Sequence, residues 1–243
     1  MSTVNGSATV TRSNAAAVPL QVGDPIFKND ALATGPAATL GVTFDDETTF
    51  SLSPNTRIVV SEYVYQRDGN ANVAVFGVLV GTAAFVASQV AKTGDMKITT
   101  PFATLGIRGT TGVVDVPQGG GEEPRIKLYA DSDGHVGQIE VFSAQGGRLG
   151  VLTQGASAFA LRAGPGGRYE AVPFRISASE AARDRGVLRR LFASHTVGRR
   201  MTIQRMRLRG RNRGRGGPGH QPFNRYPRGG QPRMPHPNGR QRR

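Results

Sequence analysis

The sequence contains no cysteine, and this absence removes several classes of function. Without thiols the chain can form no disulfide, supply no cysteine nucleophile and hold no cysteine-ligated metal. A hydrolytic triad instead needs a histidine beside a nucleophile and an acid. His135 is the only histidine before the last quarter of the chain, and no nucleophile motif lies near it. We therefore expect a protein that is not an enzyme and that needs no cofactor.

Acidic clusters are also few, and none has a complete metal-ligand pattern. Asp131-Ser132-Asp133-Gly134 has the spacing with which calcium loops begin, but the later ligands of such a loop are missing. We interpret this stretch as an ordinary Asp/Gly turn. The run Asp45-Asp46-Glu47 fits a solvated hairpin turn better than a metal cluster. The sequence thus predicts no metal site.

Acids are almost absent from the last quarter of the chain. Asp184 is the only acid in residues 183–243, which contain 18 arginines. This segment has a net charge of +17, and residues 1–182 have a net charge of −3. Electrostatic partners are therefore expected at the C-terminal segment rather than at the remainder of the protein.

Only one stretch, residues 69–91, is long and uncharged enough to be tested as a membrane span. Polar residues interrupt it, and its valine-rich halves, 73–80 and 82–86, fit two buried strands separated at Gly81. We predict no transmembrane helix. The opening residues 1–5 have neither the basic nor the apolar region of a secretory signal peptide.

Short β-prone segments with frequent turn residues occupy most of residues 7–174. Hydrophobic residues alternate in 40–44 and 50–52 on either side of the acidic turn, which predicts a hairpin with one buried face. A strand is expected near 58–62, and further strands are expected at 96–99, 103–107, 112–116, 126–130, 138–142, 149–152, 156–161 and 169–174. The fold class is therefore all-β, with one domain over 7–117 and, beyond the glycines 119–121, further β segments over 124–174 that pack on it or extend it.

A helix is predicted next, because Ser177-Ala178-Ser179-Glu180 matches a capping box in which the glutamate reaches back to the cap. Over 177–196 the residues Leu188, Leu191, Phe192 and His195 can share one face, while most arginines lie elsewhere. This short basic amphipathic helix either packs on the β domain or meets a membrane surface or a partner.

Residues 197–243 are predicted to be a disordered basic tail. From Gly210 onward, 34 residues contain nine Arg, eight Gly and six Pro, which cannot bury enough apolar surface to offset the entropy of ordering. Guanidinium groups on such a chain bind polyanions, whether nucleic acid, acidic polysaccharide or anionic lipid. The candidate polyanion-binding residues are Arg205, Arg207, Arg209, Arg211, Arg213, Arg215, Arg225 and Arg228.

An ordered set of short stretches in the first half of the chain resembles the FecR domain family, over roughly residues 15–116. The stretches are Leu20-Gln21-Val22-Gly23-Asp24, Ala33-Thr34-Gly35, residues 42–52, Asn55-Thr56-Arg57-Ile58, Gly81-Thr82-Ala83-Ala84-Phe85 and residues 98–110. The motif residues to which we assign a structural role are Gly23, Asp24, Gly81, Pro101, Arg108, Gly109 and Thr110.

The resemblance implies a small all-β domain, solenoid-like or sandwiched. In its best-known members this domain lies outside the cytoplasmic membrane and relays a signal from an outer-membrane receptor to a sigma factor. We expect a stand-alone FecR-domain protein that binds a protein partner or a ligand at the cell envelope, in the periplasm or outside the cell. The cytoplasm is the alternative compartment, and an RNA- or DNA-binding protein acting through the tail is the alternative function.

Arg108 is the one motif residue whose chemistry suggests ligand binding, because its guanidinium offers five donors. We favour a structural role, with Arg108 bound to a carboxylate such as Asp24 or Asp115 or to turn carbonyls.

Overall fold

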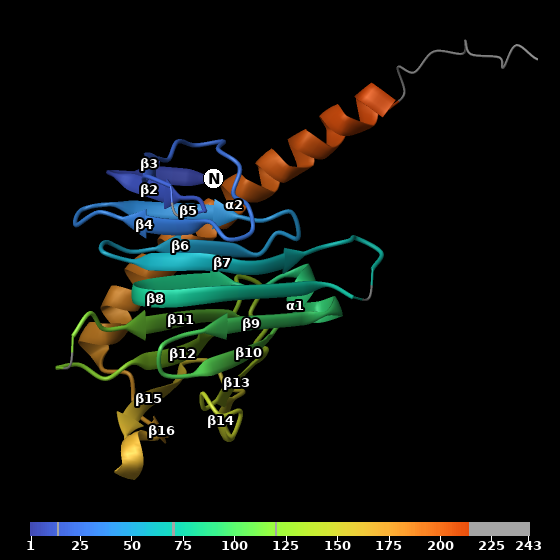
Figure 1. The fold of residues 1–243 in the computed structure, drawn as a ribbon. Coiled ribbons are helices and arrows are strands. Elements are labelled where there is room, and N and C mark those ends of the chain that lie inside the picture. Colours follow the sequence, from blue (N-terminus) through green and yellow to red (C-terminus); the bar gives the residue numbers. More distant parts are fainter. Residues whose placement is uncertain (14, 70, 120, 214–243) are drawn as a thin grey trace, which may run out of the picture.

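The structure, a computed structural model, describes residues 1–13, 15–69, 71–119 and 121–213, with side chains to Arg207. Two β-sheets share strand β8 and enclose one hydrophobic core between them (Figure 1). The first sheet has the order β1-β5-β6-β8-β11-β12-β15-β16, and the second has the order β3-β2-β4-β7-β8-β9-β10-β13-β14. The predicted all-β fold class is confirmed, with one long C-terminal helix added; of the two expected arrangements, solenoid-like or sandwiched, the two sheets around one core correspond to the sandwiched one.

From β5 onward most strands are short and follow the predicted segments, whereas β1 to β4 were not individually predicted and β8 is a single strand of 14 residues. Their bounds are β1 Thr3–Asn5, β2 Ala8–Thr11, β3 Val18–Pro19, β4 Ala31–Thr34, β5 Thr39–Thr43, β6 Thr49–Leu52, β7 Arg57–Val64, β8 Val73–Val86, β9 Asp95–Thr99, β10 Thr104–Arg108, β11 Thr111–Val116, β12 Arg125–Tyr129, β13 Gln138–Phe142, β14 Arg148–Leu152, β15 Ser157–Ala163 and β16 Tyr169–Pro173. All neighbouring strands are antiparallel except β8 and β9. Because β12 pairs with β11 and β13 pairs with β10, the strands after the glycines 119–121 continue both sheets.

Strand β8 links the two sheets, and Gly81 is the residue at which it passes from one to the other. Residues before Gly81 pair with β7 and β9, and residues after it pair with β6 and β11. The expected pair of strands is therefore one bent strand, and its φ of 91° at Gly81 explains why a glycine occupies the bend. Among the described helices, none combines the length and hydropathy that crossing a membrane requires.

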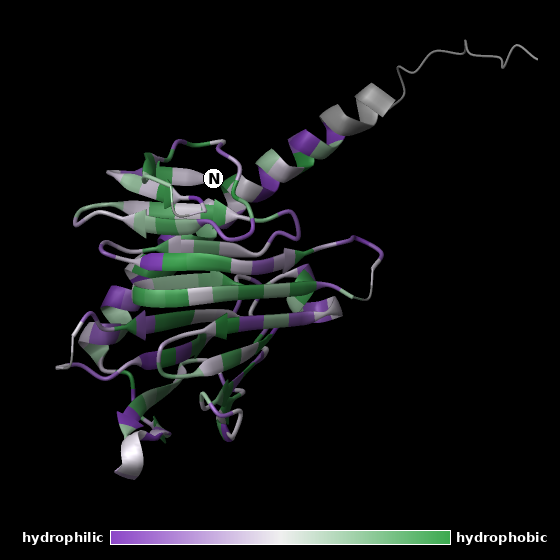
Figure 2. Cartoon of the chain, in the orientation of Figure 1, coloured by the Kyte–Doolittle hydropathy of each residue, from purple (hydrophilic) through white to green (hydrophobic). Residues whose placement is uncertain are grey.

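The core is built from the inward-facing positions of both sheets. Phe50, Phe76 and Phe85 are completely buried at its centre, and the rings of Phe50 and Phe76 lie 4.6 Å apart. Hydrophobic and hydrophilic residues alternate along many strands in Figure 2, as expected for strands with one buried face.

The hairpin turn between β5 and β6 differs from the prediction, because Asp46 is completely buried rather than solvated. Its Oδ2 accepts hydrogen bonds from the Thr48 hydroxyl at 2.6 Å and from the backbone N–H of Val90 at 3.1 Å. The second bond satisfies a free N–H at the start of the short helix α1, Gln89–Thr93. Asp46 therefore holds a hairpin and a helix together, which the local sequence does not reveal.

The long helix α2, Ala178–Arg213, crosses the outer face of the first sheet and projects beyond the β body (Figure 1). Its buried positions recur every three or four residues, at Val187, Leu191, Ser194, Gly198 and Thr202. A side chain at Gly198 would collide with Thr43, so the glycine lets the helix approach the sheet closely. The helix is thus packed on the β domain, one of the two alternatives left open by the sequence.

The predicted end of this helix at residue 196 is wrong, as is the prediction of disorder for residues 197–213. Burial of Gly198 and Thr202 continues the contact with the sheet, and the intervening arginines, methionines and glutamine are good helix formers. Residues 214–243 lie outside the described part of the chain, and with them Arg215, Arg225 and Arg228.

Candidate functional site

A buried cluster of charged residues fastens α2 to the β body. Lys127 of β12 is completely buried, and its ammonium group contacts three carboxylates. It lies 2.8 Å from Asp115 on the neighbouring strand β11, 3.0 Å from Glu180 and 2.8 Å from Asp184 on α2. One lysine therefore links two strands of the sheet to the first turns of the helix.

Further polar contacts complete the cluster. The Tyr129 hydroxyl donates a hydrogen bond to Asp184 at 2.6 Å, and Arg125 binds Glu180 at 3.1 Å. Arg183 lies 4.0 Å from Asp115 at the solvent edge. The cationic side chains thus balance the three carboxylates, and this balance is what makes the burial of so many charges tolerable.

The protonation states fit this structural role. Burial by itself disfavours the charged amine, but the three carboxylates outweigh it, so the pKa of Lys127 is raised above its ordinary value. Burial would likewise raise the pKa of Glu180, but its contacts with Lys127 and Arg125 lower it below the ordinary value. Burial and the hydrogen bond to Asp184 raise the pKa of Tyr129. Lys127 is therefore held protonated, which prevents it from acting as a nucleophile.

The start of α2 confirms only half of the predicted capping box. The Ser177 hydroxyl accepts the backbone N–H of Glu180 at 3.2 Å, as expected of a cap. The Glu180 side chain, however, does not return to the cap but binds Arg125 and Lys127. The ion pairs with the sheet compete successfully with the local hydrogen bond.

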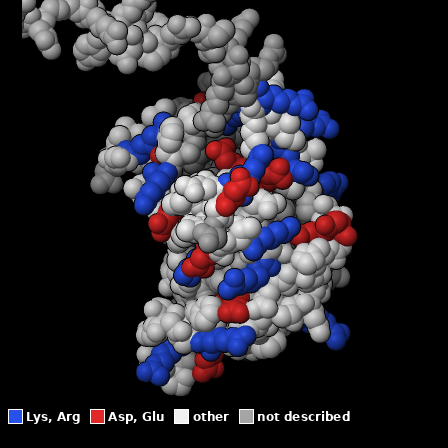
Figure 3. Space-filling model, turned by 90° about the vertical axis from the view of Figure 1, so that its right-hand side faces the viewer, with Lys and Arg blue, Asp and Glu red and all other residues white. Residues whose placement is uncertain are grey.

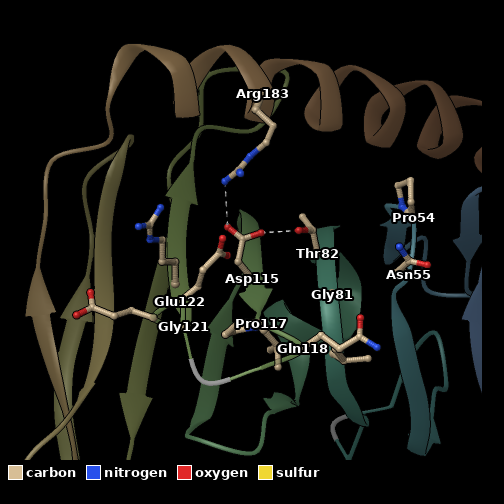
Figure 4. A pocket seen from close by; sticks show the side chains of 14 residues that line it. Pro54, Asn55, Gly81, Thr82, Asp115, Pro117, Gln118, Gly121, Glu122 and Arg183 are labelled. Carbon is tan, nitrogen blue, oxygen red and sulfur yellow. Dashed lines mark hydrogen bonds and ion pairs between the residues drawn. The ribbon is translucent and has the colours of Figure 1, made fainter. Parts of the chain in front are cut away.

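A cleft of about 550 Å³ opens beside this cluster (Figure 4). It lies where the turn before β7, the bend of β8, the β11–β12 hairpin and the start of α2 meet. In Figure 4, Asp115 lies between Arg183 and Thr82, and its Oδ1 accepts the Thr82 hydroxyl at 2.6 Å. Polar and charged side chains dominate its wall, including Asn55, Glu122 and Arg125. The cleft contains cationic, anionic and neutral side chains that can form hydrogen bonds with a ligand or a peptide.

The motif residues expected to have a structural role are spread over three places. Gly23 and Asp24 form a turn at the N-terminal end, where Oδ2 of Asp24 accepts the backbone N–H of Gln21 at 2.8 Å. Gly81 lines the cleft. Pro101 lies in the turn between β9 and β10. The structure does not bring these residues into one site.

Residues 108–110 connect β10 to β11, and here the expectation for Arg108 is wrong. Arg108 is exposed and, among the described residues, makes no hydrogen bond or ion pair; Asp115 is bound to Lys127, and Asp24 accepts the backbone N–H of Gln21. Gly109 has a φ of 44°. Thr110 is completely buried, and its hydroxyl accepts the backbone N–H of Gly137 at 3.2 Å.

The remaining sequence predictions concern metals and the arginines of α2. The Asp/Gly turn is confirmed, because the N–H of Gly134 binds the carbonyl of Asp131 at 3.0 Å. Within the described ranges, no three His, Asp or Glu side chains lie in a group able to hold a metal ion. Arg205 donates to the carbonyl of Gly23 at 2.9 Å, and Arg207 is exposed. Arg209, Arg211 and Arg213 lie on the last turns of α2.

Sequence reasoning missed Lys127 and its partners, although two signals were present. A lysine stands between Ile126 and Leu128 in a buried strand, and Asp184 is the only acid in an arginine-rich segment. A charged residue in an apolar strand, or a single acid among many arginines, is a reason to look for a buried partner of opposite charge.

Comparison with known families fits this architecture. The family model described as FecR protein matches residues 30–142, which run from the end of the first loop to β13. This match covers 113 of the 243 residues, just under half of the chain. The match starts later than the resemblance seen in the sequence and extends past the glycines 119–121. It ends before β14 and α2, so the three α2 members of the cluster around Lys127, namely Glu180, Arg183 and Asp184, lie outside the matched region.

Two crystal structures of a candidate anti-sigma factor from Parabacteroides distasonis ATCC 8503, at 1.65 and 2.50 Å resolution, are similar to this chain. Each is 14% identical, with a TM-score of 0.42, and the alignment covers 60% of this chain and 60% of the solved chain. The chain thus aligns with less than two thirds of the solved protein's length. No curated protein matches the sequence.

Proposed function

We propose that this protein is a non-enzymatic FecR-type module that binds a protein partner or a small ligand at the cell envelope. FecR proteins are regulatory proteins and are usually associated with the envelope, so the FecR domain supports a role in signalling or sensing. The basic C-terminal segment adds a polyanion-binding element that tethers the module. The proposed periplasmic or extracellular location follows from the same family.

The observation that carries this proposal is that the two ends of α2 have different surroundings. Its first turns are locked onto the FecR domain by Lys127, and its last turns project with exposed Arg205 and Arg207. The β body then presents the cleft beside Asp115 for contact, while Arg207, and Arg205 where it is not held by the carbonyl of Gly23, face an anionic surface.

A second candidate function is RNA or DNA binding through the C-terminal arginines. It is favoured by the helical backbone of residues 197–213, a stretch rich in arginine, and by the further arginines in residues 214–243. Guanidinium groups of this kind pair with phosphates in a salt-dependent and sequence-tolerant way.

Fractionation of cells that express the native protein separates the two candidates. The proposal predicts that most of the protein is recovered with the envelope fraction and resists nuclease treatment. A version that ends at Arg213 is compared in the same fractionation. It retains all of α2 and loses 30 residues, so its distribution shows whether residues 214–243 are needed for recovery with the envelope. Recovery of a wholly cytosolic pool that nuclease releases from nucleic acid would refute the first candidate and support the second.

A further inference from the structure

The projecting end of α2 carries exposed apolar side chains as well as arginines. Ile203 and Met206 expose 42% and 38% of their surface. Arg205 and Arg207 are exposed between and beside them. Figure 2 shows hydrophobic and hydrophilic residues next to one another on this part of the helix. Guanidinium groups bind polyanions without any contribution from exposed apolar side chains beside them.

Two loops of the β body meet this helix end. Arg205 binds the carbonyl of Gly23 in the loop before β4, and Arg67 in the β7–β8 loop donates to the sulfur of Met206 at 2.8 Å. Another aliphatic side chain is exposed close in sequence to each of these contacts: Val22 exposes 56% of its surface in the loop before β4, and Val64 exposes 45% at the end of β7. We call this set the apolar corner, consisting of Val22, Val64, Ile203 and Met206.

Arginines are frequent on the segments that carry the apolar corner. Arg200, Arg205 and Arg207 lie on the same helix end and Arg67 lies in the β7–β8 loop, whereas the acids of the two loops are Asp24, Asp68 and Asp30, the last of which is paired with Arg12. Figure 3 shows both signs of charge interspersed over the β body, whereas Lys and Arg side chains gather at the upper right, the side on which α2 lies. The excess of cations favours an anionic partner.

We propose that the apolar corner docks on the surface of an anionic lipid bilayer. The aliphatic side chains would enter the boundary between headgroups and acyl chains, and the surrounding arginines would pair with lipid phosphates. A bilayer interface stabilises aliphatic and cationic side chains together, whereas nucleic acid and polysaccharide stabilise only the cationic ones. This inference rests on the proposed polyanion binding of the C-terminal segment and specifies its partner.

Co-sedimentation of the full-length protein with lipid vesicles tests the proposal. We expect strong binding to vesicles of phosphatidylglycerol and phosphatidylcholine and at least about tenfold weaker binding to phosphatidylcholine alone, because each arginine near an anionic surface adds to the affinity. The double variant Ile203→Ser, Met206→Ser should lose about tenfold or more of its binding to the anionic vesicles, because two aliphatic groups no longer enter the interface.

Leu79→Ser is the matched control, because Leu79 on β8 has the same exposed fraction as Ile203, 42%. Its vesicle binding should equal that of the unaltered protein. Single-stranded RNA should bind equally to the protein and to the double variant, since their charge is identical. Equal vesicle binding by the double variant would overturn the lipid proposal but leave polyanion binding intact. Failure to bind either vesicles or RNA would overturn both proposals.

Discussion

Replacing Lys127 by methionine should destabilise the protein by about 3 to 5 kcal/mol, the cost of removing one partner from a buried ion pair. The substitution retains most of the side-chain volume but leaves Asp115, Glu180 and Asp184 facing one another without the central cation. Two of these carboxylates come from α2, so the helix should separate from the sheet most readily.

Equilibrium unfolding in denaturant measures this effect. Lys97→Met is the matched control, because Lys97 pairs with Asp95 at 2.6 Å but both side chains are about half exposed. Its loss should change the free energy of unfolding by no more than about 1 kcal/mol. Similar midpoints for the two variants would show that Lys127 does not hold α2 to the sheet.

Substituting alanine for Gly81 should also cost several kcal/mol, because two effects add at this position. The backbone has a φ of 91°, which costs a residue with a side chain about 1 to 2 kcal/mol. The new Cβ would also lie only 2.6 Å from the Cα of Thr56, and the crowding of rigid backbone adds about 1 to 3 kcal/mol. The bend of β8 between the two sheets would be disturbed.

Gly23→Ala separates these two contributions. Gly23 has a φ of 97°, but nothing lies within 4 Å of a Cβ placed there. Thermal or denaturant unfolding should therefore show a loss of about 1 to 2 kcal/mol for Gly23→Ala and a clearly larger loss for Gly81→Ala. Equal losses would mean that the close approach of Thr56 at the bend is unimportant.

Much of the β body was predictable from sequence, because alternation of hydrophobic residues reports which side chains face the core. The predicted strand at 138–142 coincides with β13, and the hairpin around the acidic turn coincides with β5 and β6. Gly81 was recognised as a break, although not as a bend within one strand that serves both sheets. Local patterns identify strands better than they identify how strands are shared between sheets.

The candidate site was much less predictable, because its residues are far apart in the sequence. Asp115, Lys127 and Asp184 come together only after the sheet has formed and α2 has crossed it. Asp46 was expected in solvent for the same reason, since its partner at Val90 belongs to a distant helix. The end of α2 was predicted too early because the arginine content of residues 197–213 is visible in the sequence, whereas their contact with the sheet is not.

Under the proposed function, one chain combines contact and tethering. The region matched by the FecR family model carries most of the polar cleft, and α2 joins it through the ion pairs of Glu180 and Asp184 with Lys127. Because these ion pairs hold α2 on the sheet, binding at its arginine-bearing end would under this proposal also orient the cleft.

Hydrogen exchange of the full-length protein tests the central claim that α2 belongs to the folded body as far as Thr202. The account predicts that amides of residues 184–202 exchange as slowly as those of β11 and β12, and that amides beyond residue 203 exchange faster. Uniformly fast exchange along the whole of α2 would contradict it, because a helix locked to the sheet by Lys127 can open only when the body opens.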